Sequence, residues 1–247
     1  MSYIQTSKHD GILTITLQRQ AQKNALSLQM YQELVEILDE YERESSLRVA
    51  VIRGDESCFC AGNDLKDFLS GGKLTKEHPT VRFIHKMAAL QKPILAAVAG
   101  PAVGIGTTML LHCDMVVAAT NSLFKLPFVQ LGLCPEAGSS LLLQELAGSK
   151  RAFELLVMSQ SFDVEAAIEI GLINESCEPS QLLGRAQELA VKIAKLPQEA
   201  LRISRELIRK PKQAELAATI ELELEHFQQL LDGEESQAII SQFFAKS

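Results

Sequence analysis

The stretch KPILAAVAGPAVGIG at residues 92–106 decides the fold. Its first part, PILAAVAG (93–100), is an apolar run bounded by proline and glycine, which is typical of a short buried strand. GPAVGIG (100–106) adds a glycine-rich turn, and a helical segment is predicted over roughly residues 103–112. A strand that leads through a turn into a helix is a building unit of α/β folds.

Further strands are predicted on both sides of this stretch. GILTITLQ (11–18) alternates apolar and polar residues, as a half-buried strand does. RVAVIRG (48–54) and DMVVAAT (114–120) are short apolar runs, which are typical of buried strands. Because strands that alternate with helices are joined by crossover connections, these segments predict a largely buried sheet in a mixed α/β core.

Helices are predicted between the strands and through the last part of the chain. After residues 24–28, one helix face is formed by Leu28, Tyr31, Leu34, Val35 and Leu38. From about residue 137 the pattern is helical, with breaks expected at Gly148, residues 161–163, Pro211 and residues 232–233. We therefore predict a core over residues 1–196 and a helical region over residues 197–247.

Composition and charge exclude several classes of protein. The chain has 247 residues, of which 47% are hydrophobic, so it can build one sizeable core. A formal net charge of −7 with scattered Lys and Arg argues against a nucleic-acid partner. The apolar stretches are shorter than the ~20 residues that span a bilayer, and no signal pattern is present. Five cysteines in no regular spacing suit a reducing compartment, so we expect a cytoplasmic protein with no membrane partner.

The usual catalytic motifs are absent from the sequence. The five histidines have no metal-ligand spacing, and no GxSxG motif occurs, so neither a metal site nor a serine hydrolase of that type is predicted. GPAVGIG contains Gly-x-Gly, but Met109 stands where a dinucleotide-binding motif has its third glycine. The turn could present backbone N–H groups to an oxyanion, or its glycines could only let a helix pack closely on a strand. The residues alone leave both interpretations open.

Two other short segments could carry chemistry. FCAGNDL (59–65) is a second turn of small residues. LGLCPEAGSS (131–140) holds a single ionisable residue, Glu136, among apolar and small neighbours. This carboxylate lies either at a solvated turn, or in the first turn of a helix over residues 138–146, or in an apolar pocket as a base. Two donor turns and one base would together suit a reaction through an enolate.

These segments, with others, resemble the crotonase superfamily of enoyl-CoA hydratases and isomerases. The resemblance covers nearly the whole chain and rests on six ordered motifs: KNALS (23–27), FCAGNDL (59–65), KPILAAVAGPAVGIG (92–106), CDMVVAA (113–119), LGLCPEAGSS (131–140) and IGLINE (170–175). It implies an α/β spiral of ββα units, a helical C-terminal region used in trimer assembly, and a CoA thioester ligand. No further cofactor is implied, because coenzyme A is part of the substrate.

The resemblance also assigns roles to individual residues. The two oxyanion donors of the family fall on the N–H groups of Asn63 and Ile105, and the second position is often glycine in the family, so the larger side chain must point away. Glu136 falls on a catalytic position. The residues implied in binding the substrate and its CoA moiety are Lys23, Ala25, Leu26, Ala61, Gly62, Asn63, Asp64, Leu65, Gly104 and, for a phosphate, Lys246.

The catalytic positions favour one branch of the superfamily. Hydratases carry two glutamates, and this chain has Thr108 and Phe128 at those positions, whereas Glu136 stands where hydratases commonly have glycine. The pattern resembles the peroxisomal type of Δ3,Δ2-enoyl-CoA isomerase, in which one base shifts the double bond of a 3-enoyl-CoA in fatty-acid degradation. An apolar surround that includes Phe128 and Leu133 should raise the pKa of Glu136.

Other functions stay open at this stage. The same scaffold supports enoyl-CoA hydration, thioester hydrolysis and dehalogenation, and a carboxylate at this position can act as a nucleophile. A non-catalytic acyl-CoA binder is a further alternative, although burial of an unused carboxylate is costly. We expect an acyl-CoA ligand and a homotrimer or a dimer of trimers.

Overall fold

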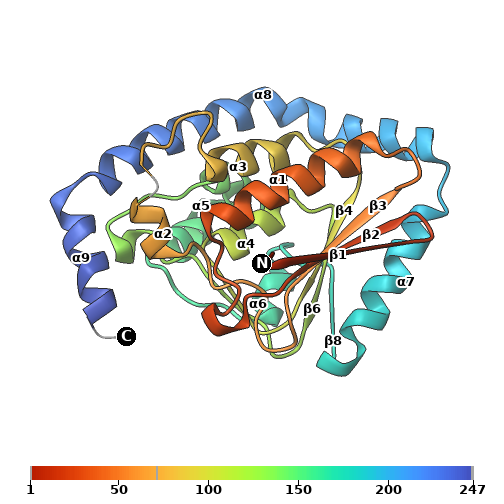
Figure 1. Cartoon of the computed structure of the whole chain (residues 1–247), viewed down its shortest axis with the longest axis horizontal. Coiled ribbons are helices and arrows are strands. Elements are labelled where there is room, and N and C mark those ends of the chain that lie inside the picture. Colours follow the sequence, from red (N-terminus) through yellow and green to blue (C-terminus); the bar gives the residue numbers. More distant parts are fainter. Residues whose placement is uncertain (1, 71, 246–247) are drawn as a thin grey trace.

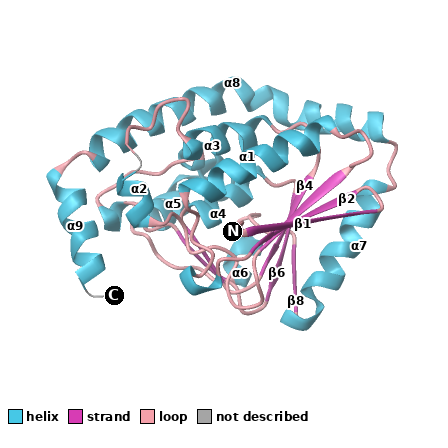
Figure 2. Ribbon diagram, in the orientation of Figure 1, coloured by secondary structure: helices cyan, strands magenta, loops and turns pink. Residues whose placement is uncertain are grey.

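The computed structural model describes residues 2–70 and 72–245. It contains a six-stranded sheet, which lies between layers of helices (Figures 1 and 2). The strand order is β1-β2-β3-β4-β6-β8, and only the β1–β2 pair is antiparallel. The strands are β1 (Ile4–His9), β2 (Ile12–Leu17), β3 (Val49–Arg53), β4 (Ile94–Val98), β6 (Met115–Ala119) and β8 (Glu175–Cys177). β3, β4 and β6 are buried almost throughout, which explains their continuous apolar sequences.

A second, two-stranded sheet continues the first. β5 (Pro101–Val103) follows β4 directly, β7 (Leu123–Lys125) follows β6, and the two short strands pair in parallel. Cys60, which follows β3, pairs with Ala102 of β5. Three central strands therefore lead to a helix in the same way, β4 and β6 through the second sheet and β3 through the bridge at Cys60 beside it. The helices that follow are α2 (Leu65–Ser70), α4 (Ile105–Thr108) and α5 (Ser139–Leu156). This arrangement confirms the predicted α/β fold of ββα units.

Helices cover both faces of the main sheet. α7 (Leu182–Ala194) packs against β3, β4 and β6 on one face. α1 (Leu28–Arg43) and α3 (Pro79–Ala89) pack together on the other side, where the larger apolar core lies (Figure 1). The remaining short helices are α6 (Val164–Glu169) and the 3-10 turns η1 (Gln20–Gln22), η2 (Met109–His112), η3 (Val129–Leu131) and η4 (Pro179–Gln181).

The long helix α8 (Gln198–Leu231) runs along the edge of the molecule and is followed by α9 (Glu234–Ala245) (Figure 1). The break between them confirms the prediction at residues 232–233, but the predicted break at Pro211 is wrong, because α8 continues through it. Tertiary contacts hold the helix on both sides of the proline. Arg205 pairs with Asp114 at 2.8 Å before it, and Ile220, Leu224 and Phe227 are buried after it. This packing offsets the hydrogen bond that proline cannot donate.

The strand β1 was not expected from the sequence. Five of its six residues are exposed, so it lacks the alternation of apolar and polar residues that identifies a half-buried strand. It pairs with β2 through the backbone and forms one edge of the sheet.

The kink of α5 at Gly148 agrees with the predicted break, because that glycine has non-helical backbone angles.

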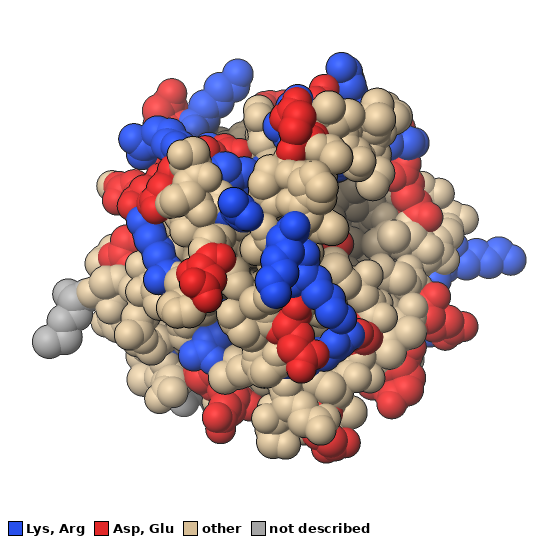
Figure 3. All heavy atoms as spheres, turned by 90° about the vertical axis from the view of Figure 1, so that its right-hand side faces the viewer, with Lys and Arg blue, Asp and Glu red and all other residues tan. Residues whose placement is uncertain are grey.

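Positively and negatively charged side chains are mixed on the face of the molecule that Figure 3 shows. On the face drawn in Figure 3, Lys and Arg side chains alternate with Asp and Glu and form no continuous basic surface. Some opposite charges form ion pairs, such as Arg185 of α7 with Glu175 and Arg202 of α8 with Glu199. Among the described residues, none of the helices is both long enough and apolar enough to span a bilayer.

Candidate active site

The two predicted donor turns lie side by side, directly after the residues that pair in or beside the second sheet. The Cys60 carbonyl accepts a hydrogen bond from the Val103 N–H at 2.9 Å, next to the Cys60–Ala102 pair. Asn63 lies three residues after Cys60, and Ile105 lies three residues after Ala102. Gly62 has a φ of +99°, and a Cβ added to it would lie 3.0 Å from the Val103 carbonyl oxygen. Only glycine therefore allows the two turns to approach so closely.

The backbone N–H groups of Asn63 and Ile105 are available as donors. Ile105 is the first residue of α4, where an N–H has no acceptor within the helix. Within the described parts of the chain, neither N–H donates to another backbone carbonyl. The side chain of Ile105 is buried in the main core, as expected for a residue that must keep its side chain out of the site.

Tyr31 supports the first of these turns and lies near the predicted base. Its hydroxyl donates a hydrogen bond to Oδ1 of Asn63. Burial raises the pKa of Tyr31 well above its ordinary value, and the nearby carboxyl of Glu136 raises it further. Tyr31 is therefore a neutral donor that orients Asn63, and Glu136 lies within its electrostatic reach.

The segments predicted to bind CoA are joined by backbone hydrogen bonds. The Ala61 N–H donates to the Lys23 carbonyl at 3.0 Å, and the Leu26 N–H donates to the Gly62 carbonyl at 2.8 Å. The Asp64 N–H donates to the Leu26 carbonyl, and the Asp64 carboxylate pairs with Arg19 at 2.7 Å.

The other predicted binding residues lie in or beside these segments. Ala25 is in the first segment, Leu65 begins α2 directly after the second, and Gly104 precedes Ile105. The structure thus brings together all the predicted binding residues that it describes. Lys246 lies outside the described residues.

Glu136 is a buried acid beside α4. Its side chain is 3% exposed, and its Oε1 accepts a hydrogen bond of 2.6 Å from the hydroxyl of Thr108, one turn beyond Ile105. Burial raises its pKa to about 8, although the hydrogen bond from Thr108 opposes this shift. The alternatives of a solvated turn and of the first helical turn are both wrong, because the residue is buried and α5 begins only at Ser139.

The backbone after Glu136 is held in an unusual conformation. Ala137 and Gly138 have φ angles of +59° and +73°, in the left-handed region. Nε2 of His112 lies 2.7 Å from the Ala137 carbonyl, and burial lowers the pKa of His112 to about 4. The neutral ring therefore donates from Nε2 to this carbonyl and holds the strained turn.

A second acid, Glu223 of α8, supports the same loop and was not predicted as a site residue. Its carboxylate accepts hydrogen bonds from the N–H groups of Gly138 and Ser140 and from the Ser140 hydroxyl, at 2.5 to 2.9 Å. The helical spacing of buried Ile220, Leu224 and Phe227 places residue 223 on the buried face. An acid within that apolar face was the signal in the sequence that could have identified it.

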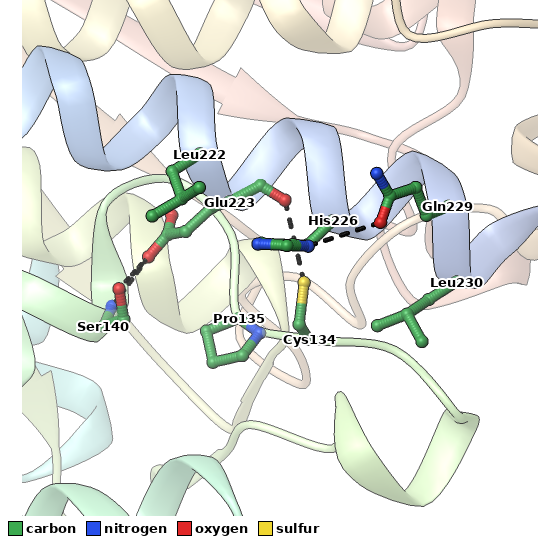
Figure 4. Close-up of a pocket in the computed structure, with 8 residues that line it drawn as sticks. All are labelled: Cys134, Pro135, Ser140, Leu222, Glu223, His226, Gln229 and Leu230. Carbon is green, nitrogen blue, oxygen red and sulfur yellow. Dashed lines mark hydrogen bonds between the residues drawn. The ribbon is translucent and has the colours of Figure 1, made fainter.

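Figure 4 shows a groove between this loop and α8. The groove has a volume of about 460 Å³, and Glu223 points across it to Ser140. It is lined by Cys134, Pro135, Ser140, Leu222, Glu223, His226, Gln229 and Leu230. In the described parts of the chain, no group of three His, Cys, Asp or Glu side chains is arranged to hold a metal ion.

Comparison with known proteins identifies the family. Residues 7–247 match the family described as enoyl-CoA hydratase/isomerase. A solved structure of OdaA from Pseudomonas aeruginosa is 39% identical, with a TM-score of 0.96 over 98% of this chain and 99% of that chain. The chain therefore belongs to the enoyl-CoA hydratase/isomerase family, which confirms the predicted resemblance.

The relatives do not share one reaction. The 1,2-epoxyphenylacetyl-CoA isomerase of Escherichia coli is 31% identical over 92% of this chain and 89% of its own. Enoyl-CoA delta isomerase 2 of Rattus norvegicus is 33% identical over 89% of this chain and 58% of its own. Enoyl-CoA hydratases and a 4-chlorobenzoyl coenzyme A dehalogenase also match. The family membership supports an acyl-CoA enzyme and leaves the reaction to be argued from the site.

Proposed function

We propose that this protein is a Δ3,Δ2-enoyl-CoA isomerase, with Glu136 as its single base. The observation that carries the proposal is the buried carboxyl of Glu136, held by Thr108 one helical turn from the Ile105 N–H. Thr108 and Phe128 stand at the positions where hydratases carry glutamates, so the site has no second carboxylate there to hold a water molecule. A 1,3-shift of a proton needs only one base, which is the number that this site offers.

The proposed reaction is a proton transfer along one face of the substrate. The thioester oxygen of a 3-enoyl-CoA would accept hydrogen bonds from the N–H groups of Asn63 and Ile105. Glu136 would then take a proton from carbon 2; the C–H electron pair delocalises into the thioester and leaves a dienolate. The protonated carboxyl returns the proton to carbon 4, and the double bond lies between carbons 2 and 3. Each oxyanion donor contributes about 3 kcal/mol to such a transition state.

The raised pKa of Glu136 suits this role. A carboxylate of ordinary pKa is a weak base toward a carbon acid, whereas a pKa of about 8 brings Glu136 closer to the pKa of the proton that it removes. The same burial that raises the pKa keeps bulk water from the reacting carbons.

We also propose that the protein assembles as a homotrimer, or a dimer of trimers, in the cytoplasm, through its helical C-terminal region (197–247). Several large apolar side chains on α8 are exposed in the single chain, among them Ile203, Leu207, Ile208 and Leu222. Large apolar side chains left exposed on a single chain are often covered at an interface between subunits. Analytical ultracentrifugation tests this proposal, and a monomer at micromolar concentration would contradict it.

The function is tested by assays of wild type and Glu136→Gln with 3-enoyl-CoA and 2-enoyl-CoA substrates. We expect wild type to isomerise the 3-enoyl-CoA and to hydrate the 2-enoyl-CoA poorly. The substitution should lower isomerisation by about a hundred- to ten-thousand-fold, because it removes the base. Glu165→Gln, at an exposed carboxylate of α6, is the matched control and should leave the rate unchanged.

Four outcomes would decide against the proposal. Efficient hydration of the 2-enoyl-CoA by wild type would make the protein a hydratase. Binding of acyl-CoA without turnover of either substrate, or of 4-chlorobenzoyl-CoA, would favour a non-catalytic binder. Release of free CoA would indicate thioester hydrolysis, and release of chloride from 4-chlorobenzoyl-CoA would indicate a dehalogenase with Glu136 as its nucleophile.

A further inference from the structure

The helix α5 begins without a cap of its own. Its N-cap residue is Gly138, which has no side chain to accept hydrogen bonds from the first N–H groups of the helix. Glu223 of α8, 85 residues further along the chain, supplies the missing acceptor. Its Oε2 accepts from the Gly138 N–H at 2.6 Å, and its Oε1 accepts from the Ser140 N–H at 2.9 Å.

This cap is ionic and buried. Glu223 is 7% exposed, and its carboxylate also accepts a hydrogen bond from the Ser140 hydroxyl at 2.5 Å. Burial raises the pKa of Glu223, while its three donors act in the opposite direction. Negative charge at a helix N-terminus is also stabilised by the helix dipole. These contacts favour the ionised carboxylate in this position.

Only one residue separates the base from this cap. Glu136 and Gly138 are separated by Ala137, whose φ of +59° is unfavourable for a residue with a Cβ. A backbone in this state persists only where its surroundings fix it. The capped N–H of Gly138 on one side and the His112 contact to the Ala137 carbonyl on the other provide that restraint.

We propose that Glu223 is a positioning residue for Glu136: by bridging Gly138 and Ser140, it fixes the loop that presents the Glu136 carboxyl to Thr108. The inference rests on the proposed function of Glu136 as the base and extends it to α8. The hydrogen bonds of the Glu223 carboxylate go to Gly138 and Ser140 and not to the substrate segments at residues 23–26 and 61–65, so it should act on turnover rather than on CoA binding. Its negative charge also raises the pKa of Glu136.

The experiment compares wild type with Glu223→Gln and Ser140→Ala. A glutamine offers one acceptor oxygen where the carboxylate offers two, and its NH2 group faces a donor, so the cap is weakened. We expect kcat to fall at least tenfold in Glu223→Gln, with KM within threefold of wild type. Ser140→Ala removes one of the three hydrogen bonds and should give an intermediate loss. Glu225→Gln, at an exposed acid two residues along α8, should match wild type.

A pH profile separates positioning from a purely structural role. Loss of the charge at residue 223 lowers the pKa of Glu136, so the midpoint of the kcat/KM profile should move to lower pH in Glu223→Gln. Thermal unfolding of each variant shows whether it is folded at the assay temperature. Folded variants with wild-type kcat, or with a reduced kcat at all pH values and an unmoved midpoint, would overturn the proposal.

A measurement without turnover distinguishes this inference from the proposed function. The infrared carbonyl band of the protonated Glu136 carboxyl, assigned by its loss in Glu136→Gln, can be titrated in the absence of substrate. We expect its midpoint to be lower in Glu223→Gln than in wild type. If wild type does not isomerise any 3-enoyl-CoA but this shift occurs, the proposed reaction is wrong and the coupling of the two acids stands. If wild type isomerises and the band does not shift, the coupling is wrong.

Discussion

The hydroxyl of Thr108 donates to Oε1 of Glu136 across 2.6 Å, within a part of the core where both side chains are almost fully buried. The bond occupies one carboxyl oxygen and leaves the other free. It also ties the base to α4, the helix whose first residue carries one of the two proposed oxyanion donors. One short helix therefore sets the distance between the base and the developing negative charge.

Thr108→Val should raise the pKa of Glu136 further. The hydrogen bond from Thr108 stabilises the ionised carboxyl, and a bond to a charged group contributes about 1.5–3 kcal/mol, or about one to two pH units. Activity at pH 7 should therefore fall more than activity at pH 9. The pH dependence of kcat/KM measures this shift. Thr108→Ser retains the hydroxyl and should keep the wild-type midpoint; a serine variant that behaves like valine would show that the hydroxyl is not the cause.

In wild type, kcat/KM should rise with pH and level off above about pH 8. The base acts in its ionised form, and the pKa of Glu136 is raised to about 8, so the ionised fraction falls tenfold for each pH unit below that value. Initial rates at low substrate concentration between pH 5.5 and 9.5 test this expectation, as measured in buffers of constant ionic strength. A plateau that already begins near pH 5 would mean that Glu136 ionises as an ordinary carboxyl.

The sequence predicts the core well because a strand that is buried on both faces of the sheet has an almost wholly apolar sequence. Strands such as Ile94–Val98 read as unbroken apolar runs, and their flanking glycines mark the turns. The continuation of α8 through Pro211 was missed because it depends on contacts with residues such as Asp114, about a hundred positions away. The exposed edge strand β1 was missed because its backbone pairing needs no apolar pattern.

The site was predicted in part for a similar reason. Asn63, Ile105 and Glu136 lie in short segments whose glycines and isolated charge are visible locally, but it was the resemblance to the crotonase superfamily that implied their roles. His112 and Glu223 act on the loop at residues 136–138 from other elements, and only the fold brings them there. The sequence did predict a carboxylate at the N-terminus of α5 as one alternative. The structure assigns that position to Glu223 instead of Glu136.

Glu136→Gln should stabilise the protein at high pH. The folded state holds this proton up to about pH 8, whereas the unfolded chain loses it near the ordinary value of 4.5, so stability falls as pH rises between these values. At about 1.4 kcal/mol per pH unit, the ionised carboxyl costs on the order of 5 kcal/mol above pH 8. Glutamine does not ionise, so the variant buries no charge at high pH. Urea unfolding should show the variant to be more stable at pH 9 and close to wild type at pH 5; an equal difference at both pH values would contradict this account.

Gly106→Ala should damage both stability and activity. A Cβ at residue 106 would lie 2.5 Å from the Cys60 carbonyl oxygen and 2.9 Å from the Cys60 Cβ, so the second turn of the site must move away from the first. We expect a loss of about 2 kcal/mol or more in the free energy of unfolding, together with a lower kcat, because Ile105 is the adjacent residue.

Gly184→Ala is the matched control, since this glycine is exposed within α7 and a Cβ there meets nothing within 4 Å. That substitution should stabilise the protein by about 0.5–1 kcal/mol and leave kcat unchanged, because alanine favours a helix over glycine. Equal effects of the two substitutions in urea unfolding would show that close contact between the turns does not matter.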